Sequence, residues 1–441
     1  MECVSTDVNG RASLVHSGRW AEADEALLGE LDGASGARAL ELVECPRPPA
    51  STPAPAPSHV VGLARCAAAR AVVLANAGHD RAAAVRHADE AFALAGEIDP
   101  DTFWHSMLVL LHAEELDRVE DECRVLARSP RHRTVVPLLL ARVLALSGDL
   151  TNAHGVLSGV VERTGSSLAV AWLVEVMAEL GHPDRAVALL ESRGLRGAMR
   201  GAEHRAHLLA ARGAAGLAAG RFRPALQDLL DAGRVLASLG VRNPSVVMWQ
   251  ARAALCASAL RQPDLAVALA EEQYAAAQRW NSPWGRATAL HALAIARTDE
   301  RSMQRLQHAI ELVAAGRAQG GRTRMCYDLA VLLRERQSFR DAESLLDTAM
   351  QAARSAGNVT WADRVARATE AVVSARTTAG GRLSSQEITT ARLARSGLSN
   401  REIAAQLCLT TRTVEHHLSG VYQKLGISGR PDLAFALGAL S

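Results

Sequence analysis

The sequence predicts an all-α protein in which an array of helix hairpins is followed by a small four-helix domain. Three observations support this class. The 441-residue chain is 49% hydrophobic but only 3% aromatic, and its apolar residues are mainly Ala, Leu and Val, which favours helix over sheet. A short turn motif recurs along most of the chain. The last 60 residues carry several helix-start signals.

The composition also excludes classes of protein. Of 49 basic residues only Lys424 is a lysine, and it lies outside any Gly-rich phosphate loop, so a P-loop ATPase and a protein kinase are both excluded. The sequence contains no nucleophile elbow, no zinc-protease motif and no paired-carboxylate motif, so we expect no catalysis, no metal and no cofactor. No apolar run approaches 18 residues, which predicts a cytoplasmic protein without a membrane span.

The recurring turn has a small residue or Gly, then a polar or charged pair, then Ala-Leu periodicity. It occurs near positions 18, 78, 148, 181, 220, 262 and 337. Several intervals are close to 34–42 residues and the longer ones are close to double, with one degenerate turn expected between Ala294 and Ser302. This spacing resembles that of tetratricopeptide repeats, stacked helix hairpins that bury a continuous core only together.

Two segments interrupt the array. Residues 44–58 are rich in proline and are expected to form a linker or exposed loop. A final helix is predicted over about 359–376, followed by a flexible hinge at 377–382 that contains Gly380 and Gly381. We therefore divide the chain into a helical-repeat sensor or scaffold (1–376) and a C-terminal domain (383–441).

The C-terminal domain is expected to contain four helices. Ser384 with Glu387, and Ser399 with Glu402, have the spacing of capping boxes at the starts of the first two. Thr410 is a suitable N-cap for a third, longer helix that ends before Gly426. A fourth is expected from about 431 to 440. Two short helices, a turn and a longer helix form a helix-turn-helix pattern.

The third helix has one apolar and one polar face. Val414, Leu418, Val421 and Leu425 recur at helical spacing and predict the buried stripe. The other face presents side chains that can contact base edges in a major groove: Arg412, Glu415, His416 and Ser419. Four further residues are suited to contact phosphates: Asn400, Thr411, Thr413 and Lys424. Residues 382–432 contain seven basic and four acidic residues, a charge of +3 that favours nucleic-acid binding.

Four blocks of this domain together resemble the LuxR-type DNA-binding domain: Leu383–Ile388, Gly397–Ala404, Thr413–Leu418 and Lys424–Gly426. The resemblance implies sequence-specific binding to promoter DNA, a homodimer formed through the fourth helix, and activation through RNA polymerase. It places base contacts on Glu415, His416 and Ser419, where many members have Lys at the first and last of these positions. The chain as a whole resembles the C-terminal portion of large ATP-binding LuxR-family regulators, without their ATPase domain.

We therefore predict a transcriptional regulator whose repeats receive a small-molecule or protein signal of unknown identity. The alternative is a tetratricopeptide-like adaptor whose C-terminal module contacts protein instead of DNA. Within the repeats, His204 and His207 are expected on a solvated helix face. Of the tryptophans there, most are expected in the core, and a few could line a groove.

Overall fold

The computed structural model describes residues 59–94, 100–195, 197, 199, 204–381, 385–407, 409–425 and 427–433. Every regular element in these ranges is a helix, which confirms the predicted class. The expected turn near residue 18 and the proline-rich segment 44–58 lie outside the described residues. The chain divides into two compact units, residues 1–329 with 348–363 and residues 330–347 with 364–441.

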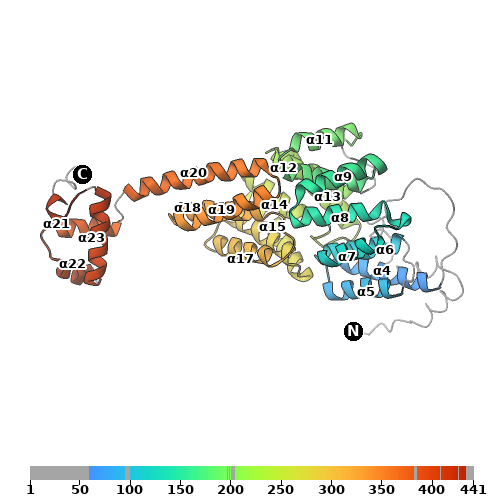
Figure 1. The fold of residues 1–441 in the computed structure, drawn as a ribbon, viewed down its shortest axis with the longest axis horizontal. Coiled ribbons are helices and arrows are strands. Elements are labelled where there is room, and N and C mark those ends of the chain that lie inside the picture. The colour runs from blue at the N-terminus through green and yellow to red at the C-terminus, as the bar shows by residue number, and fades with distance from the viewer. Residues whose placement is uncertain are drawn as a thin grey trace. The chain divides into compact units, whose positions relative to one another are not determined.

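Helices α4 to α19 form eight consecutive hairpins (Figure 1). Their bounds, in pairs, are α4 (His59–Ala77) and α5 (Arg81–Leu94); α6 (Pro100–His112) and α7 (Leu116–Leu126); α8 (Val135–Ser147) and α9 (Leu150–Thr164); α10 (Ser167–Glu179) and α11 (Pro183–Ser192); α12 (Arg205–Ala218) and α13 (Phe222–Ser238); α14 (Trp249–Ala259) and α15 (Pro263–Trp280); α16 (Pro283–Arg297) and α17 (Ser302–Ala315); α18 (Arg322–Glu335) and α19 (Phe339–Ser355).

Each hairpin turns at a residue with positive φ. These residues are Gly78, Glu114, Gly148, Gly181, Gly220, Arg261, Thr298 and Gln337, so successive turns are 33 to 41 residues apart. The turns predicted from residue 78 onward are confirmed, including the degenerate one at Thr298. The long interval between residues 78 and 148 contains a further hairpin, which turns at Glu114.

Gly148 shows how such a turn forms. With φ of 89° it adopts the left-handed conformation that glycine tolerates without steric cost. The Asp149 N–H then donates to the Leu144 carbonyl at 2.9 Å, which closes the C-terminus of α8. The Asp149 side chain accepts from the Asn152 N–H and caps the start of α9.

Two glycines of α12, Gly213 and Gly216, mark a close approach between α12 and α13. A Cβ atom added to Gly213 would lie 2.6 Å from Leu229 Cγ, and one added to Gly216 would lie 2.8 Å from Ala225 Cβ. Both partners belong to α13. The glycines of α12 therefore let the two helices of this hairpin pack at a distance that alanine would not allow.

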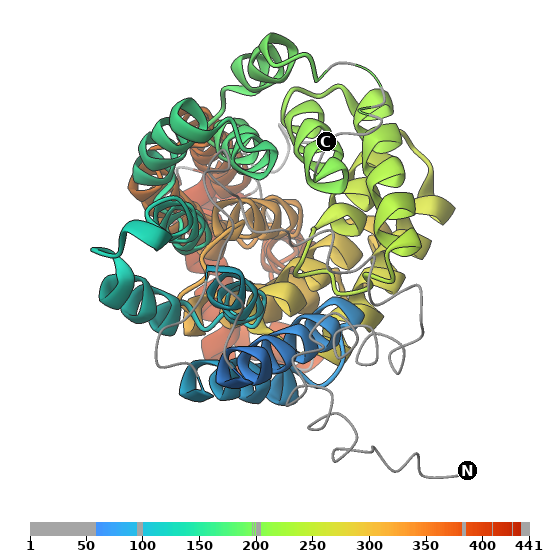
Figure 2. The same cartoon turned by 90° about the vertical axis from the view of Figure 1, so that its right-hand side faces the viewer.

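The first helix of each hairpin faces the interior of the array. In α6, nine of 13 residues are buried, against three of 11 in α7. In α10 nine of 13 are buried, against two of 10 in α11. Figure 2 shows the helices following one another around a common axis, from blue through green to yellow.

Contacts between residues about 170 positions apart hold successive windings together. Asn243 Nδ2 donates to the Ala75 carbonyl at 2.7 Å, and Trp280 Nε1 donates to the His112 carbonyl at 2.7 Å. The Glu114 carboxylate accepts from the N–H groups of Trp284 and Gly285 at 2.9 and 3.1 Å. One full winding therefore takes between four and five hairpins of about 37 residues each.

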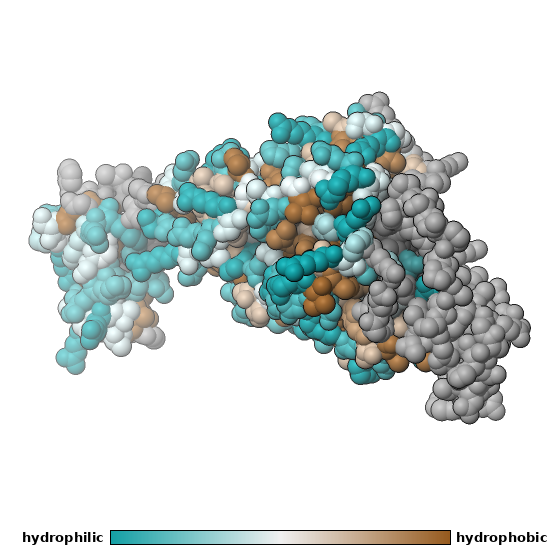
Figure 3. Space-filling model, turned by 45° about the vertical axis from the view of Figure 1, so that its right-hand side comes forward, coloured by the Kyte–Doolittle hydropathy of each residue, from teal (hydrophilic) through white to brown (hydrophobic). Residues whose placement is uncertain are grey.

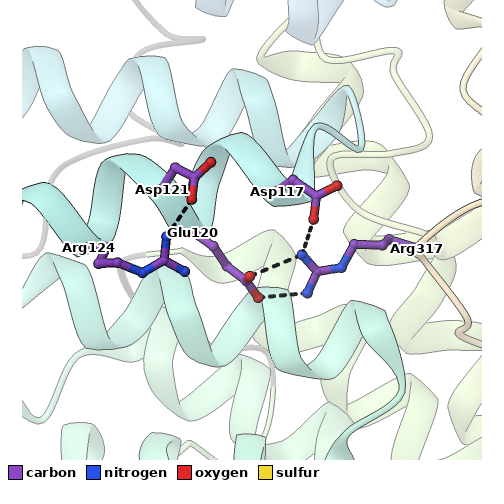
Figure 4. Close-up of polar contacts among 5 residues, drawn as sticks. All are labelled: Asp117, Glu120, Asp121, Arg124 and Arg317. Carbon is purple, nitrogen blue, oxygen red and sulfur yellow. Dashed lines mark hydrogen bonds and ion pairs between the residues drawn. The ribbon is translucent and has the colours of Figure 1, made fainter.

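Charged side chains add to these contacts on the outside. Arg317 donates to both carboxylate oxygens of Glu120, at 3.1 and 2.7 Å, and also pairs with Asp117 (Figure 4). The bidentate geometry with Glu120 is the strong form of this ion pair. Arg124, which lies on α7 with Asp117 and Glu120, pairs with Asp121 of the same helix. The segment around Arg317 is thereby tied to α7 of the preceding winding.

The array ends in the long helix α20 (Val359–Gly381). The predicted helix end at residue 376 is wrong, since the helix includes residues 377–381 of the proposed hinge. Gly380 and Gly381 lower helix propensity by about 1 kcal/mol each relative to Ala, which is too little to end this 23-residue helix before them. Residues 382–384 lie outside the described residues.

The C-terminal domain contains α21 (Ser385–Arg395), α22 (Asn400–Leu407) and α23 (Thr411–Leu425), followed by the short 3-10 turn η2 (Arg430–Asp432). The three predicted helices are confirmed within a residue or two. The fourth predicted helix lies almost entirely in residues 434–441, outside the described part of the chain. The domain has its own core, formed by Ala391, Ala394, Ile403, Ala404, Val414, Leu418, Val421 and Leu433.

Candidate nucleic-acid interface

The first element of the interface is the capped start of α22. The Ser399 N–H donates to Glu402 Oε2 at 2.7 Å, and the Glu402 N–H donates back to Ser399 Oγ at 3.3 Å. This reciprocal pair is the predicted capping box. The hydrogen bonds from Ser399 lower the pKa of the Glu402 carboxyl. The carboxylate is therefore ionised at neutral pH, and its negative charge interacts favourably with the positive N-terminal end of the helix dipole.

Helix α23 starts directly after Thr410, as predicted. The Thr413 N–H donates to Thr410 Oγ1 at 3.2 Å, and the two threonine hydroxyls lie 2.7 Å apart. One of the otherwise unpaired N–H groups of the first turn is thus satisfied. Three residues separate Leu407 at the end of α22 from Thr411 at the start of α23, the turn length of a helix-turn-helix.

Packing determines which face of α23 meets solvent. Val414, Leu418 and Val421 are buried, as predicted, and they share one core with Ile403 and Ala404 of α22. Because three consecutive turns of the helix are anchored by these side chains, rotation about the helix axis is excluded. The polar face is held outward as a result.

All four residues predicted to contact base edges lie together on that outward face. Arg412, Glu415, His416 and Ser419 are exposed, and so is Gln423 one turn further on. None of the hydrogen bonds or ion pairs described for the chain engages Arg412 or Glu415. Hydrophilic side chains also cover most of the visible face of this domain in Figure 3.

The residues predicted to contact phosphates are placed less uniformly. Thr411 is exposed at the first turn of α23, and Asn400 is half-buried at the first residue of α22. The Thr413 hydroxyl is half-buried and lies against Thr410. Asn400 and Thr411 thus stand at two helix N-termini, where backbone N–H groups favour anions.

Lys424 has an intramolecular partner that spacing did not suggest. Its ammonium donates to Glu387 Oε2 of α21 at 2.8 Å, and the carboxylate side chain is only 10% exposed. Glu387 also lies so close to Gly420 that a Cβ there would be 2.8 Å from Oε1. The pair joins α21 to α23 on the flank of the helix, away from the face formed by Arg412, Glu415 and Ser419.

The C-terminal domain is similar in sequence to known regulatory proteins. Residues 382–437 match the family described as bacterial regulatory proteins, luxR family. The C-terminal domain is a LuxR-family helix-turn-helix domain. The Fimbriae Z protein of Escherichia coli K12 is 51% identical over 51 residues, which are 12% of this chain and 24% of that protein. The Fimbriae Z protein of Salmonella typhimurium is 39% identical over 62 residues, 13% and 30% of the two chains.

The chain also aligns with solved structures at low sequence identity. The Cut9–Hcn1 hetero-tetramer of the APC/C gives a TM-score of 0.49 at 11% identity and covers 70% of this chain and 55% of that one. A Rap protein complexed with competence and sporulation factor gives 0.40 at 12% identity, covering 71% and 99%. The chain spans about a quarter of the length of the curated relatives named above.

Two further results concern what the described residues lack. None of their helices combines the length and apolar character needed to cross a bilayer. Nor do they contain a group of three or more His, Cys, Asp or Glu side chains placed to hold a metal ion.

Proposed function

We propose that this chain is a sequence-specific DNA-binding transcriptional regulator, in which α23 enters the major groove and the helical repeats receive a signal. The observation that carries the proposal is the exposed polar face of α23, held outward by the buried stripe opposite it. A helix of 15 residues with one anchored and one polar face has the dimensions of a major-groove recognition helix.

Each exposed side chain has a base edge that it suits. Arg412 can donate two hydrogen bonds to guanine, and Glu415 can accept one from the cytosine amino group. His416 and Ser419 can contact purine or thymine edges. Since Glu415 would repel phosphate oxygens, its place on this face supports a role in base choice rather than in general attraction to DNA.

Attraction to the phosphates comes from elsewhere in the domain. The N-termini of α22 and α23, with Asn400 and Thr411, offer N–H and hydroxyl donors. The surplus of three positive charges in residues 382–432 adds an electrostatic attraction to the phosphates that weakens as the salt concentration rises. Because Lys424 forms an ion pair with Glu387, we assign it a role in stabilising the domain and do not count it among the main phosphate contacts.

By analogy with the LuxR family, we extend the proposal to dimerisation, activation of transcription and the response to a signal. A homodimer through the fourth helix would place two copies of α23 on a dyad-related site. Activation through RNA polymerase in the cytoplasm, with a signal received by residues 1–376, completes the proposed regulator. A signal can shift DNA binding only if it has different affinities for two states of the protein.

The test uses full-length protein and a random duplex pool over a series of salt concentrations. We expect affinity to fall steeply with salt, as counterion release requires. Arg412→Ala is expected to weaken binding by about 1–3 kcal/mol. Arg367→Ala, which removes an exposed arginine of α20, is the matched control and should leave affinity unchanged.

Two results would overturn the proposal. One is the absence of salt-dependent binding at low ionic strength, which would favour the adaptor alternative. The other is equal affinity of the Arg412 and Arg367 variants, which would remove α23 from the interface.

A further inference from the structure

Three of the four carboxylates in residues 382–432 have partners within the LuxR-family domain. Each accepts a hydrogen bond from a group of that domain: Glu387 from Lys424, Glu402 from Ser399 and Asp432 from the Ser428 N–H. These contacts join two helices, cap a helix and close the turn after α23. The three carboxylates therefore have a role in the stability of the domain.

Glu415 is the fourth carboxylate, and its surroundings differ. It is the fifth residue of α23 and is exposed on the outward face of that helix. No hydrogen bond or ion pair described for the chain engages it, and Arg412, one turn earlier on the same face, does not pair with it. A carboxylate on this face is repelled by phosphate oxygens and by every acceptor atom of the bases. Its contact with DNA therefore depends on a hydrogen-bond donor of the DNA.

The chemistry of a carboxylate limits what Glu415 can contact in a major groove. An ionised carboxylate accepts hydrogen bonds and donates none. Among the groups that face the groove, only the amino groups of cytosine and adenine are donors. The adenine amino group lies between two acceptors, adenine N7 and thymine O4, whereas the cytosine amino group has an acceptor on one side only. Cytosine N4 is therefore the best partner for Glu415.

The position of Arg412 agrees with a cytosine at this point. Arg412 and Glu415 are three residues apart, which corresponds to about 4.5 Å along the helix axis, and the buried stripe of α23 holds both outward. Neighbouring base pairs are about 3.4 Å apart, so the two side chains can reach one base pair or two adjacent ones. A G·C pair presents guanine acceptors for the arginine and the cytosine amino group for the carboxylate.

We propose that Glu415 binds the exocyclic amino group of a cytosine in the DNA site, and that methylation of this amino group at N4 prevents binding. The inference rests on the function proposed above and adds to it the chemical state of DNA that the protein accepts. In a Watson–Crick pair, the hydrogen that remains on a methylated N4 is the one that pairs with guanine. The methyl group therefore points into the major groove, in place of the donor that Glu415 requires.

The loss of affinity has two sources. The carboxylate loses its hydrogen-bond partner, and its charge is desolvated against an apolar methyl group without compensation. Methylation at C5 is different, because 5-methylcytosine keeps both hydrogens of its amino group. The two modified bases therefore separate the loss of the donor from the mere presence of a methyl group in the groove.

The test measures binding of the full-length protein to four duplexes that share the sequence selected by the wild type from a random pool. The first is unmodified. The second carries N4-methylcytosine, and the third 5-methylcytosine, at the position where Glu415→Ala relaxes base choice. The fourth carries N4-methylcytosine in the flanking DNA. We expect the second duplex to bind about tenfold or more weakly than the first, and the third and fourth to bind nearly as well as the first.

Two variants accompany the wild type. Glu415→Ala has no carboxylate to be left unpaired, so it should bind the unmodified and N4-methylated duplexes with equal affinity. Glu370→Ala, which removes an exposed carboxylate of α20, is the matched control and should discriminate as the wild type does. Fluorescence anisotropy at one fixed salt concentration measures all of these affinities.

Three results would overturn the inference while the regulator proposal stands. One is relaxation of base choice by Glu415→Ala at an A·T pair. Another is equal binding of the wild type to the unmodified and N4-methylated duplexes. The third is an equal loss with 5-methylcytosine, which keeps its amino donor. Failure of the regulator proposal gives a different result, because the wild type then shows no salt-dependent binding to any duplex, and the inference fails with it.

Discussion

Replacing Glu175 by Gln is expected to destabilise the repeat unit by about 3 kcal/mol at neutral pH. The pKa of this carboxyl falls from 4.5 to about 2 in the folded protein, and a drop of that size corresponds to about 3 kcal/mol in favour of the folded state. The side chain is 13% exposed, so solvent screens the interaction little. Arg142 and Arg252 both donate to this carboxylate, so its loss also removes the acceptor that the two guanidiniums share.

The pH dependence provides the second part of this prediction. Because the folded-state pKa is depressed, the stabilisation is complete above pH 4.5 and is lost as pH falls from 4.5 towards 2. The difference between wild type and Glu175→Gln should therefore be largest near neutrality and shrink below pH 4.5. Urea unfolding followed by tryptophan fluorescence measures the free energy at each pH.

Glu271→Gln is the matched control. Glu271 pairs with Arg297 on the surface, where its side chain is 48% exposed, and such pairs contribute about 0–1 kcal/mol. Equal stabilities of the two variants at pH 7 would refute the reasoning. So would a deficit in Glu175→Gln that stays constant as the pH is lowered through 4.5.

Four further substitutions test the helix packing, a helix cap and an ion pair. Gly216→Ala should destabilise the repeat unit by about 1–3 kcal/mol through overpacking, whereas Gly155→Ala, where the added Cβ meets nothing within 4 Å, should be neutral or stabilising by up to about 1 kcal/mol; urea unfolding distinguishes the signs. Ser399→Ala should cost the C-terminal domain about 1 kcal/mol through its lost cap, seen as a lower unfolding midpoint of that domain. Lys424→Gln should lower the same midpoint, because it leaves the carboxylate of Glu387 unpaired, and should leave the salt dependence of DNA binding unchanged; a slope reduced by about one would instead show a phosphate contact.

The repeat architecture was predictable because most of its turns are determined by a few neighbouring residues. Gly148 and Gly181 occupy left-handed positions that glycine favours, and the regular spacing between such turns indicates stacked hairpins. Glu114 has no such local signal. Its left-handed conformation accompanies contacts with Trp284 and Gly285, some 170 residues away. The sequence therefore showed only one long interval between the turns at residues 78 and 148, and the hairpin between them was not identified.

The candidate DNA interface was predictable for a similar reason. The amphipathic period of α23 follows from residues three or four apart, and Glu415 and His416 lie on the exposed face as that period predicts. The role of Lys424 was not predictable, because Glu387 stands on a different helix 37 positions earlier. The same holds for the ion pairs of Glu175, whose partners Arg142 and Arg252 stand on other hairpins, 33 and 77 positions away.

Selection of bound DNA from a random duplex pool tests the central claim most directly. Full-length wild-type protein and its Glu415→Ala variant would be compared, with Glu370→Ala, which removes an exposed carboxylate of α20, as the control. The account predicts one enriched dyad-like motif for wild type and Glu370→Ala, and the same motif with relaxed choice at one base pair of each half-site for Glu415→Ala. Enrichment of no motif, or of an identical motif by all three proteins, would contradict the claim that the exposed face of α23 contacts the bases.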